Sequence, residues 1–244
     1  MSKPFLIIQL RPEDETADNE LHAIQHYGGL KENEVSRIRA EKNGLPKINL
    51  DDYSAIIVGG SPFDISTHQD KKSDIQNQVE ADFYRLFDDI FKRDFPFLGC
   101  CSGNGLLGSY CGATISKQYG EPVGGTDIAF TEEGKKDHLL KHFPETIRVL
   151  TGHKEACDVT PNGSVLLASN EQCPVQMFRI QENIYATQFH PEADATGFEV
   201  RINIYKDFGY FPPETAELLI QAVHNESTPH AQLILQRFVE SYRA

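Results

Sequence analysis

Residues 97–108 read FLGCCSGNGLLG, an apolar strand followed at once by a turn of small residues and then by a helical pattern. A residue at the tip of such a turn has a strained backbone, and glycines on either side prevent collisions. Gly99 and Gly103 stand two positions before and after Cys101. The pattern places Cys101 at the carboxyl end of a strand, beside a helix N-terminus whose partial positive charge favours a thiolate. We interpret Cys101 as a nucleophile; the alternative is a small apolar residue that ends a buried strand.

Apolar runs rich in β-branched and aromatic residues lie on both sides of this segment. The predicted strands cover residues 5–10, 54–58, 95–100, 146–150, 164–168, 175–180 and 184–189. The predicted helices between the early strands cover residues 18–26, 75–91 and 103–110. Nearly continuous apolar strands separated by helices are typical of a parallel sheet that is covered on both faces. We therefore expect an α/β fold with an open, mostly parallel sheet and helices on both faces.

The later strands follow one another directly, through turns such as Pro-Asn-Gly at residues 161–163. Such turns predict an antiparallel extension of the sheet. From about residue 197 the chain returns to helical patterns, which are clearest over residues 214–224 and 229–242. These patterns predict a helical C-terminal tail.

The chain carries no marked domain boundary in its sequence. Residues 61–72 and 117–125 read as loops, but both are short. We therefore expect a single domain over residues 1–244, with a core at about 5–192 and a helical tail at about 197–244.

The composition is that of a folded, soluble protein. Of 244 residues, 39% are hydrophobic and 24% are charged, and the net charge is -13. The longest basic clusters are the pairs Lys71-Lys72 and Lys135-Lys136. Binding to nucleic acid requires a cationic face, so we expect no nucleic-acid partner.

The sequence also argues against a membrane or secreted protein and against a bound cofactor. The apolar run at residues 5–10 is far too short for a signal sequence or a membrane span, so we expect a cytoplasmic protein. The five cysteines form no CxxC pair, which leaves no zinc motif and no disulfide framework. Because no glycine-rich phosphate loop is present either, we expect neither a metal nor a cofactor.

A candidate base for Cys101 lies far downstream. Residues 185–192 read YATQFHPE, a predicted strand that ends at His190, with Glu192 two residues later. A thiol that attacks an amide needs a base, and the base needs a group that orients it. The Glu192 carboxylate can hold the imidazole as the third member of a nucleophile-base-acid triad. The alternative is a His-Pro turn at the surface.

A candidate oxyanion site follows another strand. Residues 54–62 read SAIIVGGSP, a strand that ends in a glycine pair. Glycines let the backbone turn an N–H toward a site, and the amide of Ser102, directly after the nucleophile, is the second expected donor. A glycine pair also commonly just ends a strand.

Together these segments resemble the class I, triad-type glutamine amidotransferases. The matching motifs are residues 58–62 (VGGSP), 99–103 (GCCSG), 152–155 (GHKE), 169–174 (SNEQCP) and 188–192 (QFHPE). The likeness covers about residues 5–192. It is strongest to the stand-alone, GMP synthase-like subgroup, which shares the YGEPVG stretch at residues 119–124 and a helical tail.

The resemblance implies an open, flavodoxin-like α/β sheet and hydrolysis of glutamine to glutamate and ammonia through a γ-glutamyl thioester. It implies that Cys101 attacks the side-chain amide, that His190 transfers protons and that Glu192 orients His190. The amides of Gly60 and Ser102 would stabilise the oxyanion. The implied substrate-pocket positions are Gly59, Asn104, Gly105, His153 and Pro174.

One position departs from the family pattern. The family usually has glutamine two residues after the second glycine of the turn, and this chain has Gly105. The missing side chain removes a contact to substrate glutamine and enlarges the pocket. Three functions therefore stay open: a glutaminase that passes ammonia to a separate synthase chain, a γ-glutamyl hydrolase or peptidase, and a non-catalytic binding module of the same fold.

An aromatic stretch in the tail has no counterpart in the motifs above. Residues 205–213 read YKDFGYFPP. We expect this segment to lie near the edge of the site, as a lid, an interface or simply as packing.

Overall fold

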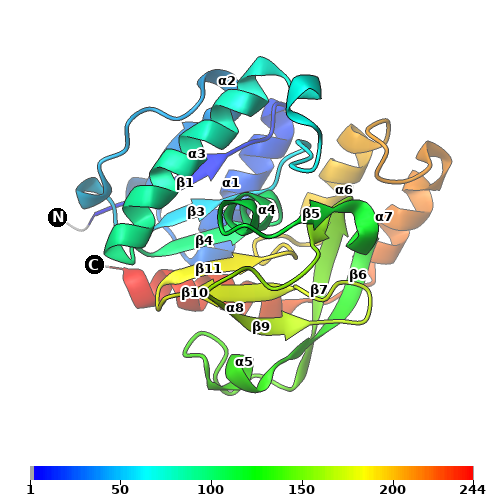
Figure 1. The fold of residues 1–244 in the computed structure, drawn as a ribbon. Helices are drawn as coiled ribbons and strands as arrows, with labels where there is room; N and C mark the ends of the chain where they lie inside the picture. Colours follow the sequence, from blue (N-terminus) through cyan, green and yellow to red (C-terminus); the bar gives the residue numbers. More distant parts are fainter. Residues whose placement is uncertain (1–2, 244) are drawn as a thin grey trace.

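The computed structural model describes residues 3–243, in which a nine-stranded sheet forms the centre of the molecule (Figure 1). The strand order is β2-β1-β3-β4-β11-β10-β9-β6-β7. Five neighbouring strands are parallel: β2 (Val35–Arg39), β1 (Phe5–Gln9), β3 (Ile56–Val58), β4 (Phe97–Cys100) and β11 (Ile184–Thr187). The sheet continues antiparallel through β10 (Met177–Ile180), β9 (Ser164–Ser169), β6 (Glu121–Phe130) and β7 (Thr146–His153). The predicted fold class is confirmed.

Helices connect most of these strands. The larger ones are α1 (Asp14–Gly28), α3 (Asp74–Arg93), α4 (Ser102–Tyr110), α6 (Ala195–Tyr205), α7 (Ala216–His224) and α8 (Pro229–Tyr242). Two are short, α2 (Ala40–Asn43) and α5 (Glu132–Lys136). A small second sheet pairs β5 (Ile115–Ser116) with β8 (Ala156–Cys157).

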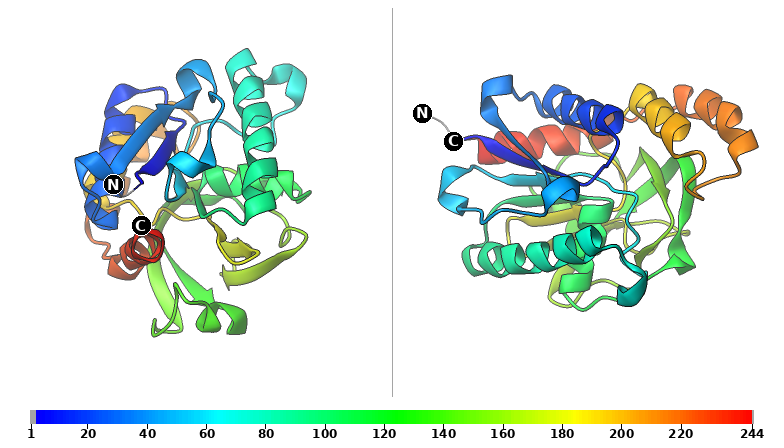
Figure 2. Two further views of the ribbon diagram at one scale, coloured as in Figure 1. Left: turned by 90° about the vertical axis from the view of Figure 1, so that its left-hand side faces the viewer. Right: turned by 90° about the horizontal axis from the view of Figure 1, so that it is seen from above.

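The sheet has a hydrophobic core on each face. In β1, Phe5 and Ile7 belong to the cluster beneath α1 and α8, whereas Leu6 and Ile8 belong to the cluster beneath α3 and α4. Alternation of side chains along a strand explains this division, because each face needs its own apolar stripe. Figure 2, in the view from above, shows α1 and α8 on one side of the sheet and α3 on the other.

Local signals explain where the longest helix begins and ends. The Ser73 side chain accepts a hydrogen bond from the backbone N–H of Gln76 at the start of α3. The last turn carries Lys92 and Arg93, and Asp94 then adopts a left-handed conformation with φ 46°. A polar cap at the start and cations near the end are what the unpaired groups and dipole of a helix favour.

Two strands of the nine-stranded sheet, and both short strands of the second sheet, differ from the sequence-based expectations. The expectation that residues 117–125 form a loop is wrong from Glu121 on, where β6 begins and pairs along its length with β7. Gly124 and Gly125 weaken the strand pattern there, and pairing with β7 overrides it. β2 has no counterpart among the predicted strands, because this edge strand is half-buried and carries Arg37 and Arg39.

The predicted helical tail is confirmed, and it covers the sheet in two places. In α6 and α7, Phe198, Ile202 and Val223 pack with Leu150 of β7. In α8, fully buried side chains such as Phe238 join the core beneath α1. Within residues 3–243, none of the helices has the length and apolarity that crossing a bilayer requires.

Candidate active site

The turn between β4 and α4 presents Cys101 in a strained conformation. Cys101 has φ 52° and ψ -97°, values that L-residues adopt at a cost of about 1–3 kcal/mol. A side chain at Gly99 would begin 2.7 Å from the carbonyl group of Gly103, so the turn requires glycine there. The Cys101 N–H donates to the carbonyl oxygen of Thr187 at 2.8 Å, which ties the turn to β11. The predicted strained turn with its flanking glycines is confirmed.

The register of the sheet brings His190 to the same edge. Thr187 of β11 lies opposite Cys100 of β4 in a parallel pair, and His190 follows three residues later. The Nδ1 atom of His190 lies 2.8 Å from Oε1 of Glu192. The Nη2 atom of Arg201, from α6, donates to the same oxygen at 3.0 Å. His190 and Glu192 are 4% and 1% exposed, so this is a buried, oriented imidazole rather than a surface turn.

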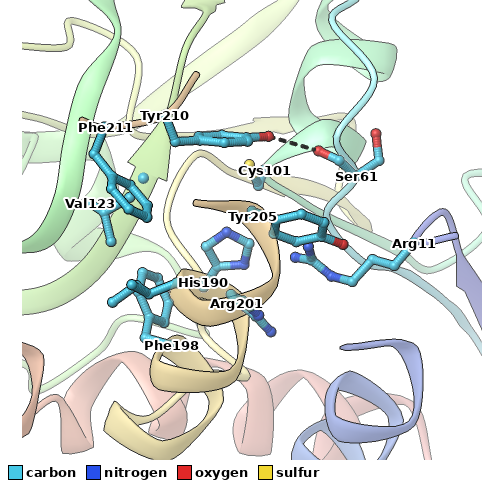
Figure 3. Close-up of a pocket in the computed structure, with 12 residues that line it drawn as sticks. Arg11, Ser61, Cys101, Val123, His190, Phe198, Arg201, Tyr205, Tyr210 and Phe211 are labelled. Atoms are coloured by element: carbon cyan, nitrogen blue, oxygen red, sulfur yellow. Dashed lines mark hydrogen bonds between the residues drawn. The ribbon is translucent and has the colours of Figure 1, made fainter. Parts of the chain in front are cut away.

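Cys101 and His190 border a common cavity of about 40 Å³, which we call the His190 cavity (Figure 3). Arg11 and Arg201 also line it. Within residues 3–243, Cys101 and His190 are not joined by a hydrogen bond. Catalytic hydrogen bonds are often longer before substrate binds, so the shared cavity is the relevant geometry.

Burial dominates the proton affinities of the site. It raises the pKa of the Cys101 thiol to about 11, although Arg11 and Arg201 act in the opposite direction. Burial lowers the pKa of His190 below its ordinary value, against the influence of Glu192. For Glu192, burial raises the pKa, but His190 and Arg201 outweigh it and hold the pKa below its usual range. A neutral imidazole, oriented by a carboxylate, therefore lies near a protonated thiol.

The expectation that the turn favours a preformed thiolate is therefore not met. Desolvation of the Cys101 sulfur outweighs the two nearby cations. A nucleophilic role for Cys101 would therefore require a base that takes the proton of the thiol, and the imidazole of His190, whose pKa is lowered by burial, borders the same cavity.

The glycine pair after β3 faces a buried ion pair. The Gly60 N–H donates to Oε2 of Glu20 at 3.2 Å, and Nε of Arg11 donates to the same oxygen at 2.7 Å. A side chain at Gly59 would collide with the Glu20 carboxylate. A side chain at Gly60 would begin 2.5 Å from Nη2 of Arg11 and 3.0 Å from Cε1 of His190. Both glycines are thus required by close packing at the site.

The predicted oxyanion donors differ in availability. The Ser102 amide is the first of α4 and belongs to the helical turn whose N–H groups have no partner within the helix. The Gly60 amide is engaged with Glu20, so its oxyanion role stays a prediction that requires this hydrogen bond to be exchanged for one to substrate.

Comparisons with known proteins agree with this arrangement. The family model described as "Glutamine amidotransferase class-I" matches residues 15–206. The chain belongs to the class-I glutamine amidotransferase family. A relative in Thermoplasma volcanium, named as one subunit of a glutamine-hydrolysing GMP synthase, is 28% identical over 75% of this chain and 84% of its own. A similarly named protein of Sulfurisphaera tokodaii is 29% identical over 65% of this chain and 77% of its own.

Solved structures share the fold. A glutamine amidotransferase from Thermotoga maritima superposes with a TM-score of 0.71 at 20% identity, covering 97% of this chain and 98% of its own. A protein from Thermoplasma acidophilum, described as a GMP synthase subunit, has a TM-score of 0.62 at 20% identity, covering 97% of this chain and 93% of its own. At this identity the likeness supports the fold of the amidotransferase.

A second cavity of the amidotransferase also borders Cys101. This Gly105 cavity, of about 30 Å³, is lined by Cys101, Gly105 and His153 among others. Of the predicted pocket residues, Gly105 and His153 therefore line a cavity that Cys101 also borders. Asn104, in contrast, is fully buried and accepts a hydrogen bond from the Cys157 thiol at 3.4 Å, and Pro174 borders neither cavity. Substrate binding by the predicted pocket residues stays a prediction.

His153 also belongs to a buried polar cluster. Its Nδ1 lies 2.9 Å from the carbonyl oxygen of Glu155, and its Nε2 lies 2.8 Å from Oε2 of Glu121. Both ring nitrogens of His153 are therefore engaged within the fold. Ligand atoms of Glu121, His153 and Cys173 lie within 4.8 Å of one another, the spacing of a possible metal site. The hydrogen bonds already made by the histidine and the carboxylate favour a structural role for the cluster.

The sequence patterns do not indicate the charged residues around the His190 cavity. Arg11 directly follows the end of the first strand pattern, and Glu20 lies on a helical pattern that reads as solvent-exposed. Both are almost fully buried, at 4% and 0% exposure. An arginine immediately after an apolar strand, at the edge where Cys101 emerges, was the available signal. The expectation that the aromatic tail segment lies near the site is confirmed, because Tyr205 and Tyr210 border the His190 cavity.

Proposed function

We propose that this amidotransferase-family protein hydrolyses a γ-glutamyl amide through a thioester at Cys101. The observation that carries the proposal is the neutral imidazole of His190, held by Glu192, in the cavity that Cys101 borders. This pairing supplies a nucleophile, a base and an orienting group, which are the parts that amide cleavage by a thiol requires.

In the first half-reaction, His190 takes the proton of the Cys101 thiol while the sulfur attacks the amide carbonyl. The C–N bond then breaks, His190 returns the proton to the leaving nitrogen, and a γ-glutamyl thioester remains on the sulfur. In the second half, water gives a proton to His190 and its oxygen attacks the thioester. The C–S bond breaks, the thiol regains its proton, and glutamate is released. The net reaction consumes one water and needs no cofactor.

The remaining groups stabilise charge as it forms. Glu192 lies against His190 and stabilises the imidazolium that exists between the two proton transfers. Arg11 exerts the strongest of the charge effects that favour the Cys101 thiolate. The unpaired first-turn amide of Ser102, with the Gly60 amide after exchange from Glu20, would donate to the developing oxyanion.

Glutamine is the simplest substrate of this kind, and ammonia is then the leaving group. We propose that the ammonia passes to a separate synthase chain, a proposal supported by relatives that are named as single subunits of GMP synthases. A cytoplasmic setting fits the chemistry, because Cys101 has to stay a reduced thiol in order to react.

An electrophilic analogue of glutamine tests the nucleophile. A diazo-ketone analogue should add once to the wild-type protein, and intact-mass and peptide spectra should place the adduct on Cys101. Cys101→Ala should lose both the adduct and the release of glutamate. Cys111→Ala, which changes another partly exposed thiol away from the cavity, is the matched control and should label normally. An adduct that persists in Cys101→Ala would exclude the mechanism.

A further inference from the structure

Cys101, the proposed nucleophile, lies between two cavities. The residues that line each cavity indicate which part of a substrate it would hold. Cys101 borders both the His190 cavity and the Gly105 cavity. Ser61 and Tyr210 also border both, and the Tyr210 hydroxyl donates to the Ser61 carbonyl oxygen at 3.4 Å (Figure 3). A carbonyl carbon placed on the sulfur would therefore have its acyl part on one side of this partition and its leaving nitrogen on the other.

The position of the base decides which side is which. His190 borders its own cavity and is not among the residues that line the Gly105 cavity. The leaving nitrogen takes its proton from His190, so the His190 cavity is the leaving-group side. The Gly105 cavity is lined by Lys154, Asp64 and Glu155. Lys154 and Asp64 form an ion pair at 2.9 Å, and Glu155 accepts from the backbone N–H groups of Ile65 and Ser66, so the ammonium and carboxylate of a γ-glutamyl group would bind here by exchange with these contacts.

The His190 cavity has an apolar wall that ammonia as a leaving group would not need. Its wall is mainly apolar, with Val123 from β6, Phe198 and Ile202 from α6, and Phe211 from the aromatic segment after α6. Ammonia makes no use of such a wall, because it has no apolar surface to bury. An amine that carries a hydrocarbon side chain would bury that side chain here.

The same cavity holds a fixed cation. Arg11 is 4% exposed, its Nε is held by Glu20, and its guanidinium carbon lies 5.7 Å from the centre of the Tyr205 ring. Within residues 3–243, the ion pair of Arg11 uses Nε, which leaves its two Nη groups without a carboxylate. Figure 3 shows the guanidinium directed into the space between Tyr205 and His190. Two Nη groups of a guanidinium are the donors that a carboxylate accepts best.

We propose that the His190 cavity binds an amino acid as leaving group, so that the substrates include γ-glutamyl dipeptides with a small apolar second residue and a free carboxylate. Arg11 binds that carboxylate, and the apolar wall receives the side chain. This inference rests on the proposed γ-glutamyl chemistry at Cys101. The reaction is the same hydrolysis: the isopeptide C–N bond breaks, water is consumed, and glutamate and the free amino acid are released.

A matched pair of substrates tests the carboxylate contact. γ-Glutamyl-valine and γ-glutamyl-isobutylamide differ only in the carboxylate of the leaving group. A charged hydrogen bond that forms in a desolvated cavity predicts a kcat/KM ratio of about tenfold or more in favour of the dipeptide. Arg11→Met should bring this ratio close to one, and Arg11→Lys should retain part of it.

Two further variants keep the test independent of folding. Each ratio compares two substrates on one enzyme preparation, so a fraction of unfolded protein cancels. Because Arg11→Met leaves the buried Glu20 carboxylate without its cation, the double variant Arg11→Met/Glu20→Gln, which removes both charges, should give the same ratio.

The apolar wall has its own test. Phe211→Ala should lower the preference for γ-glutamyl-valine over γ-glutamyl-glycine about fivefold, because it removes part of the apolar wall at a half-exposed position.

The outcomes separate this inference from the function on which it rests. Wild-type protein that hydrolyses glutamine but neither γ-glutamyl-valine nor the isobutylamide refutes the inference and leaves the proposed function standing. A dipeptide-to-isobutylamide ratio near one in the wild type refutes the role of Arg11. No turnover of any γ-glutamyl compound, glutamine included, refutes both.

Discussion

Replacing Glu192 by glutamine tests whether the buried carboxylate acts through its charge. Glu192 accepts hydrogen bonds from His190 at 2.8 Å and from Arg201 at 3.0 Å, and it is 1% exposed. Glutamine has the same shape and can still accept from His190, so the ring should keep its position. The change removes the negative charge and leaves Arg201 as an uncompensated cation beside the imidazole.

The magnitude follows from the interaction that is lost. A charge-assisted hydrogen bond in a buried site is worth about 1.5–3 kcal/mol, which corresponds to about 10- to 100-fold in kcat. The carboxylate also raises the proton affinity of His190, against the lowering by burial and Arg201. Its removal should therefore shift the pKa of His190 further down.

The assay is release of glutamate from glutamine as a function of pH. Because His190 has to be neutral to act as a base, the rate of the wild type should rise with pH through a limb below about pH 6.5. In Glu192→Gln the plateau should fall by one to two orders of magnitude, while the limb moves to lower pH. Glu199→Gln, which changes an exposed carboxylate of α6 that pairs with His224, is the control and should behave as wild type. A plateau within twofold of wild type, with an unmoved limb, would refute the role of Glu192.

Other consequences concern the turn, the tail and the pH dependence of stability. Gly99→Ala should destabilise the protein by about 1–3 kcal/mol in urea unfolding, because the new Cβ would meet the Gly103 backbone at 2.7 Å. Gly105→Ala is the matched substitution, whose Cβ meets only Ile65 at 3.4 Å, and it should stabilise α4 by about 0.5–1 kcal/mol. We propose that the tail and core form one domain, so Phe238→Ala should lower the stability of a single unfolding transition by about 3–5 kcal/mol; two separate transitions would contradict this. The lowered pKa of buried His190 stabilises the fold above about pH 6.5, so the free energy of unfolding should fall as the pH drops below that value, and less so in His190→Gln.

The balance of charges around Cys101 bears on the nucleophilic role that we propose for this buried thiol. Two arginines face the cavity, and each is paired with a buried carboxylate: Arg11 with Glu20, and Arg201 with Glu192. The two pairs offset the arginine charges, and burial raises the pKa of the Cys101 thiol to about 11, which keeps it protonated at neutral pH. In the proposed mechanism His190 takes this proton during the attack on substrate, so no permanent thiolate is exposed to oxidants.

Elements with local signals are predictable from the amino-acid sequence. The FLGCCSGNGLLG stretch contains its own strand, turn and helix start, and the strained Cys101 backbone follows from the need to pass from one to the next with glycines on both sides. The His-Pro-Glu stretch likewise places an imidazole and a carboxylate two residues apart, where they hydrogen-bond. Continuous apolar runs predicted the parallel sheet, because buried strands need apolar residues on both faces.

The surroundings of these elements depend on contacts between residues far apart in the sequence. The strand β6 owes its existence to pairing with β7, and the Gly60 amide meets Glu20 across 40 residues of sequence. Arg201 reaches Glu192 because α6 folds back over the sheet edge. Charged residues such as Arg11 look like surface residues in a sequence pattern, since burial of a charge depends on a partner that the fold brings from elsewhere. Local sequence therefore specifies the candidate nucleophile and the candidate base, whereas long-range packing sets their proton affinities and the shape of the cavity that both border.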